Sequence, residues 1–206
     1  QLAQRLESQG YEVKQIAIIK GKSGAEHSFG ILARKSHGFI VYTMAADVVM
    51  HNDNQEVSLG EVFTFDDKCY DCGIQDKVLI AFPKLDFVAA RFAQSQRIRI
   101  FDKEALEAFL TTSSPVRQSK KTVLTAFNTK LEFLQSLIDL GYKVEEKAKV
   151  KGKSGAEYSF DILAELDDGF IARRLGMDII SDEEVTLNQV CLFDTKAYDV
   201  GVQGKI

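Results

Sequence analysis

The sequence lacks tryptophan, holds only two prolines and three cysteines, and contains no apolar run of the roughly 20 residues that a membrane-spanning helix needs. Three cysteines without matched spacing argue against a disulfide framework and favour a reducing compartment, so a cytoplasmic location is expected. The first residues have neither the charged nor the apolar region of a signal peptide. We therefore expect no membrane partner.

The sequence also lacks a large excess of charge of either sign, since the formal net charge is −4 and the pI is about 5.5. This balance argues against nucleic-acid binding over the whole surface, which requires an excess of Lys and Arg. A local basic patch stays compatible with it, because phosphate contacts need only a few basic side chains on one face.

The sequence contains a long internal repeat. Gly10-Tyr11 returns 131 residues later as Gly141-Tyr142, and at the same offset KGKSGAEHSFGILA (20–33) returns as KGKSGAEYSFDILA (151–164). At an offset of 128, VFTFDDKCYDCGIQDK (62–77) matches VCLFDTKAYDVGVQGK (190–205). Roughly half of the aligned positions are identical, which indicates a duplication. The first copy extends past the last match by about 33 residues, so we interpret the second copy as incomplete.

The repeat predicts two domains joined by a linker. The polar stretch TTSSPVRQSKK contains one of the two prolines and is typical of a linker. The predicted boundaries are residues 1–110 for the first copy, 111–121 for the linker and 122–206 for the truncated second copy.

Hydrophobic periodicity predicts the order α-β-β-β-α-β-α-β-α for the first copy. The predicted elements are a helix at 2–9, strands at 11–19, 25–35 and 37–45, a helix at 57–72, a strand at 77–83, a helix at 85–96, a strand at 97–101 and a helix at 103–110. Three successive strands followed by strand–helix alternation predict an α/β fold with a mixed sheet and helices on both faces. The uniformly apolar KVLIAFP predicts a buried strand in a parallel arrangement. The second copy is expected to open with a longer helix at 122–141.

This order, with GYEV, the glycine turn and FDILA, resembles the restriction-endonuclease-like superfamily, in particular its Mrr-type branch. The resemblance implies two tandem αβββαβ cores. It also implies a metal-binding Asp on the strand after the glycine turn, and a carboxylate and a lysine on the next strand. Such a site would hold Mg²⁺ against the scissile phosphate and stabilise the developing charge.

Matched to that pattern, the two copies differ. Asp161 fits the metal-binding Asp, whereas the first copy has Gly30 there. The resemblance places the second carboxylate and the lysine near Ala172 and Arg174, and near Val41 and Thr43 in the first copy, so no carboxylate is predicted at that point. The first copy is therefore expected to be inactive. If the second copy is active, the resemblance gives Asp161 as the metal ligand and Lys196, on the following helix, as the replacement for the missing lysine. Strand alternation places Glu157 and Ser159 on the same face as Asp161, with Glu157 too far away, at about 13 Å, to share one ion directly.

Two further patterns have alternative interpretations. GKSG, at 21–24 and 152–155, would bind phosphate through lysine, serine and backbone N–H groups, or would be a hairpin turn in which glycine supplies positive φ. The pattern Asp-x-Lys-x-Tyr-Asp begins at Asp66 and at Asp194. That Asp would either cap a helix or extend into the former active-site cleft. Cys69-x-x-Cys72 has no second pair with which to form a zinc site, so we predict core cysteines.

The resulting hypothesis is a degenerate nuclease-like module that binds DNA or a protein partner through its former substrate face, without a small-molecule cofactor. The alternatives are a Mg²⁺-dependent endonuclease active only in the second copy, and a protein-interaction or regulatory domain of a larger protein. The candidate binding residues are Lys20, Lys22, Ser23, Glu26, Asp66, Lys68, Lys151, Lys153, Ser154 and Asp194.

Overall fold

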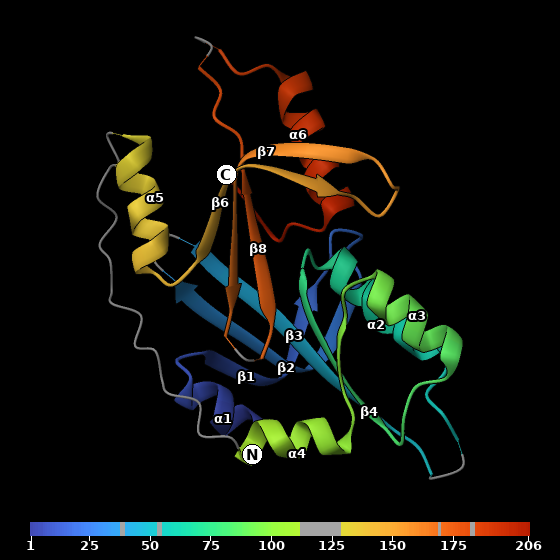
Figure 1. The fold of residues 1–206 in the computed structure, drawn as a ribbon. Coiled ribbons are helices and arrows are strands. Elements are labelled where there is room, and N and C mark those ends of the chain that lie inside the picture. The colour runs from blue at the N-terminus through green and yellow to red at the C-terminus, as the bar shows by residue number, and fades with distance from the viewer. Residues whose placement is uncertain (38–39, 53–54, 112–128, 169, 182–183) are drawn as a thin grey trace. The chain divides into compact units, whose positions relative to one another are not determined.

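A computed structural model describes residues 1–206 except 38–39, 53–54, 112–128, 169 and 182–183 (Figure 1). The chain divides into two compact units, Gln1–Ser119 and Lys120–Ile206. Each unit is α/β with its own mixed sheet. The predicted linker, after its first residue, and the first part of the helix expected at 122–141 lie outside the described residues. No described helix is long and apolar enough to cross a membrane.

Unit 1 has the predicted order of elements. They are α1 (Leu2–Ser8), β1 (Glu12–Lys20), β2 (Glu26–His37), β3 (Ile40–Met50), α2 (Leu59–Asp71), β4 (Asp76–Phe82), α3 (Phe87–Ser95), β5 (Arg99–Phe101) and α4 (Lys103–Thr111). The sheet order is β1-β2-β3-β4-β5, antiparallel between β1, β2 and β3 and parallel between β3, β4 and β5. The parallel arrangement predicted for KVLIAFP is therefore confirmed.

Strand β3 is longer than its apolar pattern predicted. It continues to Met50 because residues 44–50 pair with the parallel strand β4. This extension places Asp47 within the strand.

Helices cover both faces of the sheet in unit 1. On one face, α2 and α3 lie side by side (Figure 1), and their buried side chains, including Phe65 and Ala93, share a core with Phe29 of β2 and Leu79 of β4. On the other, α4 contacts β4, and the Arg5 guanidinium of α1 lies 5.5 Å from the centre of the Phe109 ring of α4.

Unit 2 contains α5 (Lys130–Asp139), β6 (Lys143–Lys151), β7 (Glu157–Asp167), β8 (Ala172–Met177), α6 (Leu187–Val200) and β9 (Gly204–Lys205). Its sheet order is β6-β7-β8-β9, with the first three strands antiparallel and β9 parallel to β8. Thr186 caps α6 through a capping box with Gln189, and the helix ends at Gly201, whose φ of 73° suits glycine.

The burial alternation of β7 is lost after Phe160. Phe160 and Leu163 are three positions apart, yet both belong to the core formed with α6. In a regular strand they would point to opposite faces. The alternation that groups Glu157, Ser159 and Asp161 on one face therefore does not continue to Leu163.

Candidate functional site

Strands β7 and β8 bring two aspartates together in unit 2. Ile162 pairs with Met177, so the next position on each strand places Asp161 beside Asp178. The Asp161 backbone N–H donates to Asp178 Oδ1 at 3.4 Å, and the Ile179 N–H donates to Asp161 Oδ2 at 2.7 Å. Two carboxylates from neighbouring strands are thus held next to each other by backbone contacts.

Lys196 completes this group from helix α6. Its ammonium group forms an ion pair with Asp178 and donates to the Ser159 carbonyl oxygen at 2.7 Å. It also lies 4.4 Å from the centre of the Phe160 ring. The Lys196 and Asp178 side chains are 14% and 28% exposed, so the pair is partly shielded yet open to a ligand. We refer to Asp161, Asp178 and Lys196 as the carboxylate pair with its lysine.

Unit 1 retains two of the three groups. Lys68 forms an ion pair with Asp47 and donates to the Ser28 carbonyl oxygen at 2.9 Å. The Gly30 N–H donates to Asp47 Oδ1 at 2.6 Å, but glycine supplies no second carboxylate. One aspartate is therefore balanced by one lysine in unit 1, whereas unit 2 has two aspartates for one lysine.

Asp178 and Asp47 were missed by the sequence reasoning. The resemblance located the second carboxylate near Ala172 and the lysine near Arg174, but these residues pair with Asp167 and Glu165, toward the far end of the hairpin from Asp161. The available signal was an Asp at the same offset of 131 in both copies, just beyond the predicted third strand.

Glu157 does not join the carboxylate pair. It is exposed at the beginning of β7, opposite Lys151, and a strand separation of four residues corresponds to about 13 Å. Among the described residues, no three His, Cys, Asp or Glu side chains gather around a common point. A metal ion here would consequently depend on water or substrate oxygens for its remaining ligands.

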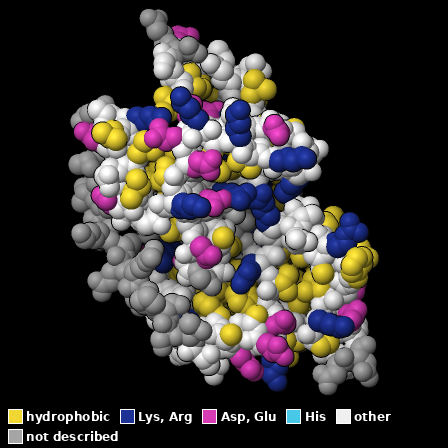
Figure 2. Space-filling view, in the orientation of Figure 1, with side chains coloured by type: hydrophobic (Ala, Val, Ile, Leu, Met, Phe, Trp, Pro, Cys, Tyr) yellow, Lys and Arg dark blue, Asp and Glu magenta, His cyan; other side chains and the backbone are white. Residues whose placement is uncertain are grey.

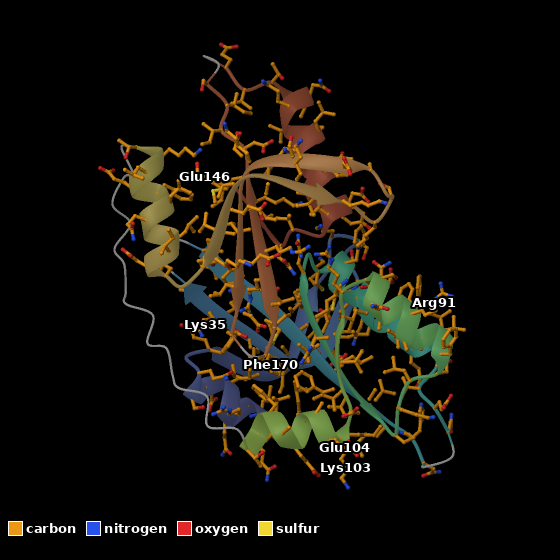
Figure 3. The ribbon with its side chains drawn as sticks, in the orientation of Figure 1. Lys35, Arg91, Lys103, Glu104, Glu146 and Phe170 are labelled. Carbon is orange, nitrogen blue, oxygen red and sulfur yellow. The ribbon has the colours of Figure 1, made fainter. Side chains whose placement is uncertain are left out.

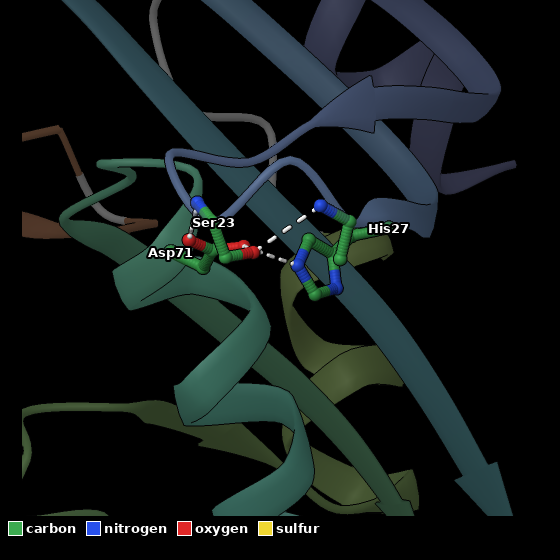
Figure 4. Close-up of polar contacts among 4 residues, drawn as sticks. Ser23, His27 and Asp71 are labelled. Carbon is green, nitrogen blue, oxygen red and sulfur yellow. Dashed lines mark hydrogen bonds and ion pairs between the residues drawn. The ribbon is translucent and has the colours of Figure 1, made fainter.

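The GKSG turn of unit 1 is hydrogen-bonded to the end of helix α2. Asp71 accepts hydrogen bonds from the Ser23 N–H at 2.8 Å and from the Ser23 hydroxyl at 2.6 Å, and it contacts His27 Nε2 at 2.6 Å (Figure 4). The Lys22 N–H donates to the Asp71 carbonyl oxygen at 2.9 Å. These contacts from Ser23 and His27 lower the pKa of Asp71 to about 2. We call this arrangement the turn clamp.

Unit 2 has the same turn clamp. Asp199 accepts from the Ser154 N–H at 2.9 Å and from its hydroxyl at 2.5 Å, and the Lys153 N–H donates to the Asp199 carbonyl oxygen at 3.0 Å. Hydrogen bonds from Ser154, with a smaller contribution from Tyr158, lower the pKa of Asp199. Tyr158 thus stands where unit 1 has His27.

The turn clamp occupies groups that a phosphate site would need. The hydroxyls of Ser23 and Ser154 are engaged by carboxylates, which favours the hairpin interpretation of GKSG. The lysine side chains stay at the surface. Lys22 Nζ lies 5.8 Å from the centre of the Tyr70 ring, and Lys153 Nζ lies 5.5 Å from that of Tyr198. Lys20 and Lys151 are exposed at the ends of their strands, with Glu26 and Glu157 opposite them.

Asp66 and Asp194 lie in the middle of their helices, so neither caps a helix. Asp66 binds Lys77 at 2.5 Å, and Asp194 binds Lys205 at 2.5 Å. Each pair joins the helix to the strand that follows it.

The three cysteines are free. Burial raises the pKa of the Cys69 thiol, as expected for a core cysteine, and Cys72 is partly buried. Cys191 is exposed.

A cavity of about 310 Å³ adjoins the carboxylate pair through Asp178. Its wall is mainly apolar, with Phe133, Met177 and Ile179, and Lys130 supplies a basic group. Space beside the site is therefore available to part of a bound molecule.

Comparison with known proteins gives no family. No family model matches the sequence, and no curated protein matches it. The chain is similar in structure to AF1548, a protein of unknown function, with a TM-score of 0.46 and 18% identity over 66% of this chain and 73% of that one.

Proposed function

We propose that unit 2 hydrolyses phosphodiester bonds with a divalent cation bound between Asp161 and Asp178. The observation that carries this proposal is the juxtaposition of these two carboxylates with Lys196. It favours the endonuclease alternative, in the second copy only, over a module without catalysis.

The carboxylate pair fits a small divalent cation. Two carboxylates and one ammonium group leave a net charge of −1, which attracts a divalent cation. Mg²⁺ is commonly held by one or two carboxylates and completes its coordination with water and substrate phosphate oxygens. When bound, such an ion polarises the phosphoryl group and makes a bound water more acidic.

Lys196 is suited to stabilise negative charge on the substrate. Its ammonium group has three N–H donors, and the Ser159 carbonyl oxygen and Asp178 hold it in place. The ammonium nitrogen also lies 4.4 Å from the centre of the Phe160 ring, a cation–π contact that further restrains it. A donor positioned before the reaction needs little reorganisation as charge develops on a phosphate oxygen.

Unit 1 is proposed to bind without catalysis. Asp47 is fully balanced by Lys68, and a Cβ added at Gly30 would lie 3.3 Å from the Ala46 carbonyl oxygen and 3.4 Å from Asp47 Oδ1. The structure leaves little room for a second carboxylate there. The role proposed for this copy is to bind DNA or a protein partner, with the exposed Lys20 and Lys22 as candidate contacts.

The test is nuclease activity of the full chain on single-stranded and duplex DNA in Mg²⁺, Mn²⁺ or EDTA. We expect cation-dependent cleavage that falls by roughly 10²-fold or more in Asp161→Asn and in Asp178→Asn. The matched control is Asp47→Asn in unit 1, which should cleave like the unmodified chain. Cleavage that persists in EDTA, or full activity of Asp161→Asn, would refute the proposal. No cleavage of either DNA would leave only the binding role.

A further inference from the structure

Unit 2 carries a row of lysines along strand β6 and the turn that follows it. Residues 147–156 contain Lys147, Lys149, Lys151 and Lys153 and no acidic residue. The corresponding residues 16–25 of unit 1 contain two lysines, and two isoleucines stand in place of Lys147 and Lys149. Within this segment, the copy that has the carboxylate pair therefore has two more lysines than unit 1.

The lysine row begins beside the carboxylate pair. Glu146 pairs with Ile162 and Ala148 with Phe160, which places Lys147 opposite Asp161. Lys149 lies opposite Ser159, and the row continues outward toward the turn. Strand β6 lies at the edge of the sheet, and Lys147, Lys149 and Lys151 are exposed. Figure 2 shows Lys and Arg side chains interspersed with Asp and Glu in the region where β6 and β7 lie in Figure 1.

The charge reverses on the other side of Lys147. Glu145 and Glu146 precede it, and Glu146, labelled in Figure 3, is engaged by Lys130 at 2.6 Å. Within the described part of the chain, neither Lys147 nor Lys149 forms an ion pair. Their charges are thus available to a ligand, and the row has a defined inner end at Asp161.

The spacing of the row suits a nucleic-acid strand. On a regular strand, side chains two residues apart, such as those of Lys149 and Lys151, are about 7 Å apart, comparable with the distance between successive phosphates of one strand. Lys147, whose φ is 52°, lies at the inner end of the row, where the regular strand conformation is interrupted. Lysine and arginine contacts to phosphate supply most of the sequence-independent affinity of nucleic-acid binding.

Protection of the sheet edge is the competing explanation, because lysines on edge strands prevent pairing between sheets. Unit 1 argues against it. Ile16 and Ile18 occupy the same edge positions there and are 80% and 61% exposed. The same fold therefore tolerates apolar residues at this edge, and the lysines of unit 2 need another reason.

We propose that Lys147 and Lys149, continued by Lys151, bind successive phosphates of a nucleic-acid strand and lead it to the carboxylate pair. This inference rests on the proposed function and names its substrate as a polyanionic strand. Lys147 and Lys149 are positioning residues, since they lie beside the group that would act on the phosphodiester bond.

The experiment measures binding separately from cleavage. Fluorescence anisotropy of labelled single-stranded and duplex DNA is recorded in EDTA at increasing salt, and cleavage is followed in Mg²⁺. The first test variant, Lys147→Ile/Lys149→Ile, copies the residues of unit 1. The second, Lys147→Gln/Lys149→Gln, removes the same charges with polar residues and serves if the isoleucine variant does not fold. The control, Lys14→Gln/Lys103→Gln, removes the same charge from exposed sites of unit 1, where Lys103 begins α4 (Figure 3).

We expect the test variants to reduce the slope of log affinity against log salt by about 1.8 for duplex or about 1.4 for single strands. Between 50 and 200 mM salt, the unmodified chain would then lose about tenfold more duplex affinity than the variants. The control should keep the original slope. Binding that depends on both lysines without cleavage would support the lysine row and refute the nuclease. Cleavage with unchanged slopes would support the nuclease and refute the lysine row. Binding to polyglutamate in preference to DNA would overturn the lysine row in favour of an acidic protein partner.

Discussion

Replacing Asp161 with Asn is expected to have opposite effects on stability with and without a divalent cation. Neighbouring strands are about 4.8 Å apart, so two carboxylates at that distance repel each other by roughly 1 kcal/mol in a water-like dielectric and about 3 kcal/mol near a protein surface. Lys196 offsets part of this repulsion, and Asn can still accept the hydrogen bond from the Ile179 N–H. We expect the free energy of unfolding of unit 2 to rise by about 1 kcal/mol in EDTA.

In Mg²⁺, the unmodified unit 2 should instead be more stable than the Asp161→Asn variant. A cation at ten times its dissociation constant stabilises the unmodified unit by about 1.4 kcal/mol, and the variant should lose this gain. Unit 2 spans residues 120–206, which is 87 residues, and for a domain of that size about 1 kcal/mol shifts the melting temperature by about 4–8 °C.

The assay is scanning calorimetry of the full chain in EDTA and in Mg²⁺. The two units can melt separately, so the transition of unit 2 is identified by its loss in a variant that disrupts only its core, such as Phe160→Ala. The control Asp47→Asn should lower the transition of unit 1, because it leaves the partly buried Lys68 without its carboxylate, and Mg²⁺ should not restore it. If Asp161→Asn destabilises unit 2 in EDTA, or if Mg²⁺ shifts it as much as the unmodified unit, the reasoning fails.

Three other outcomes are expected. Ser23→Ala should move acid unfolding of unit 1 to higher pH. Contacts from Ser23 and His27 lower the pKa of Asp71 from 3.8 to about 2, so the stabilisation is present above about pH 4 and is lost as the pH falls toward 2. Without the hydroxyl the pKa is lowered less and the stabilisation is smaller, and far-UV circular dichroism during an acid titration would show the shift. Ile16→Asn should raise the free energy of unfolding by about 1 kcal/mol in urea titrations, because a β-branched residue holds a φ of 51° there and Asn adopts this conformation more readily. In timed alkylation read by mass spectrometry, exposed Cys191 should react first and buried Cys69 only on unfolding; early labelling of Cys69 would contradict the packing.

Much of the fold could be predicted from the sequence because the elements of unit 1 depend on local patterns. The apolar KVLIAFP indicated a strand buried in a parallel arrangement, and Gly10 marked the end of the first helix, where its φ is 86°. Strand ends were less predictable. Asp47 belongs to β3 because β4 pairs with it along 44–50, and that pairing partner is distant in sequence.

The candidate site was also predictable from the sequence only in part. The resemblance gave Asp161 as a candidate metal-binding carboxylate and Lys196 as a replacement lysine, and the repeat showed that unit 1 has Gly30 in place of Asp161. Only the tertiary structure showed that Asp178 lies beside Asp161 and binds Lys196. The register between β7 and β8 decides which residues meet. That register depends on the pairing of two strands, which no pattern within a single strand contains.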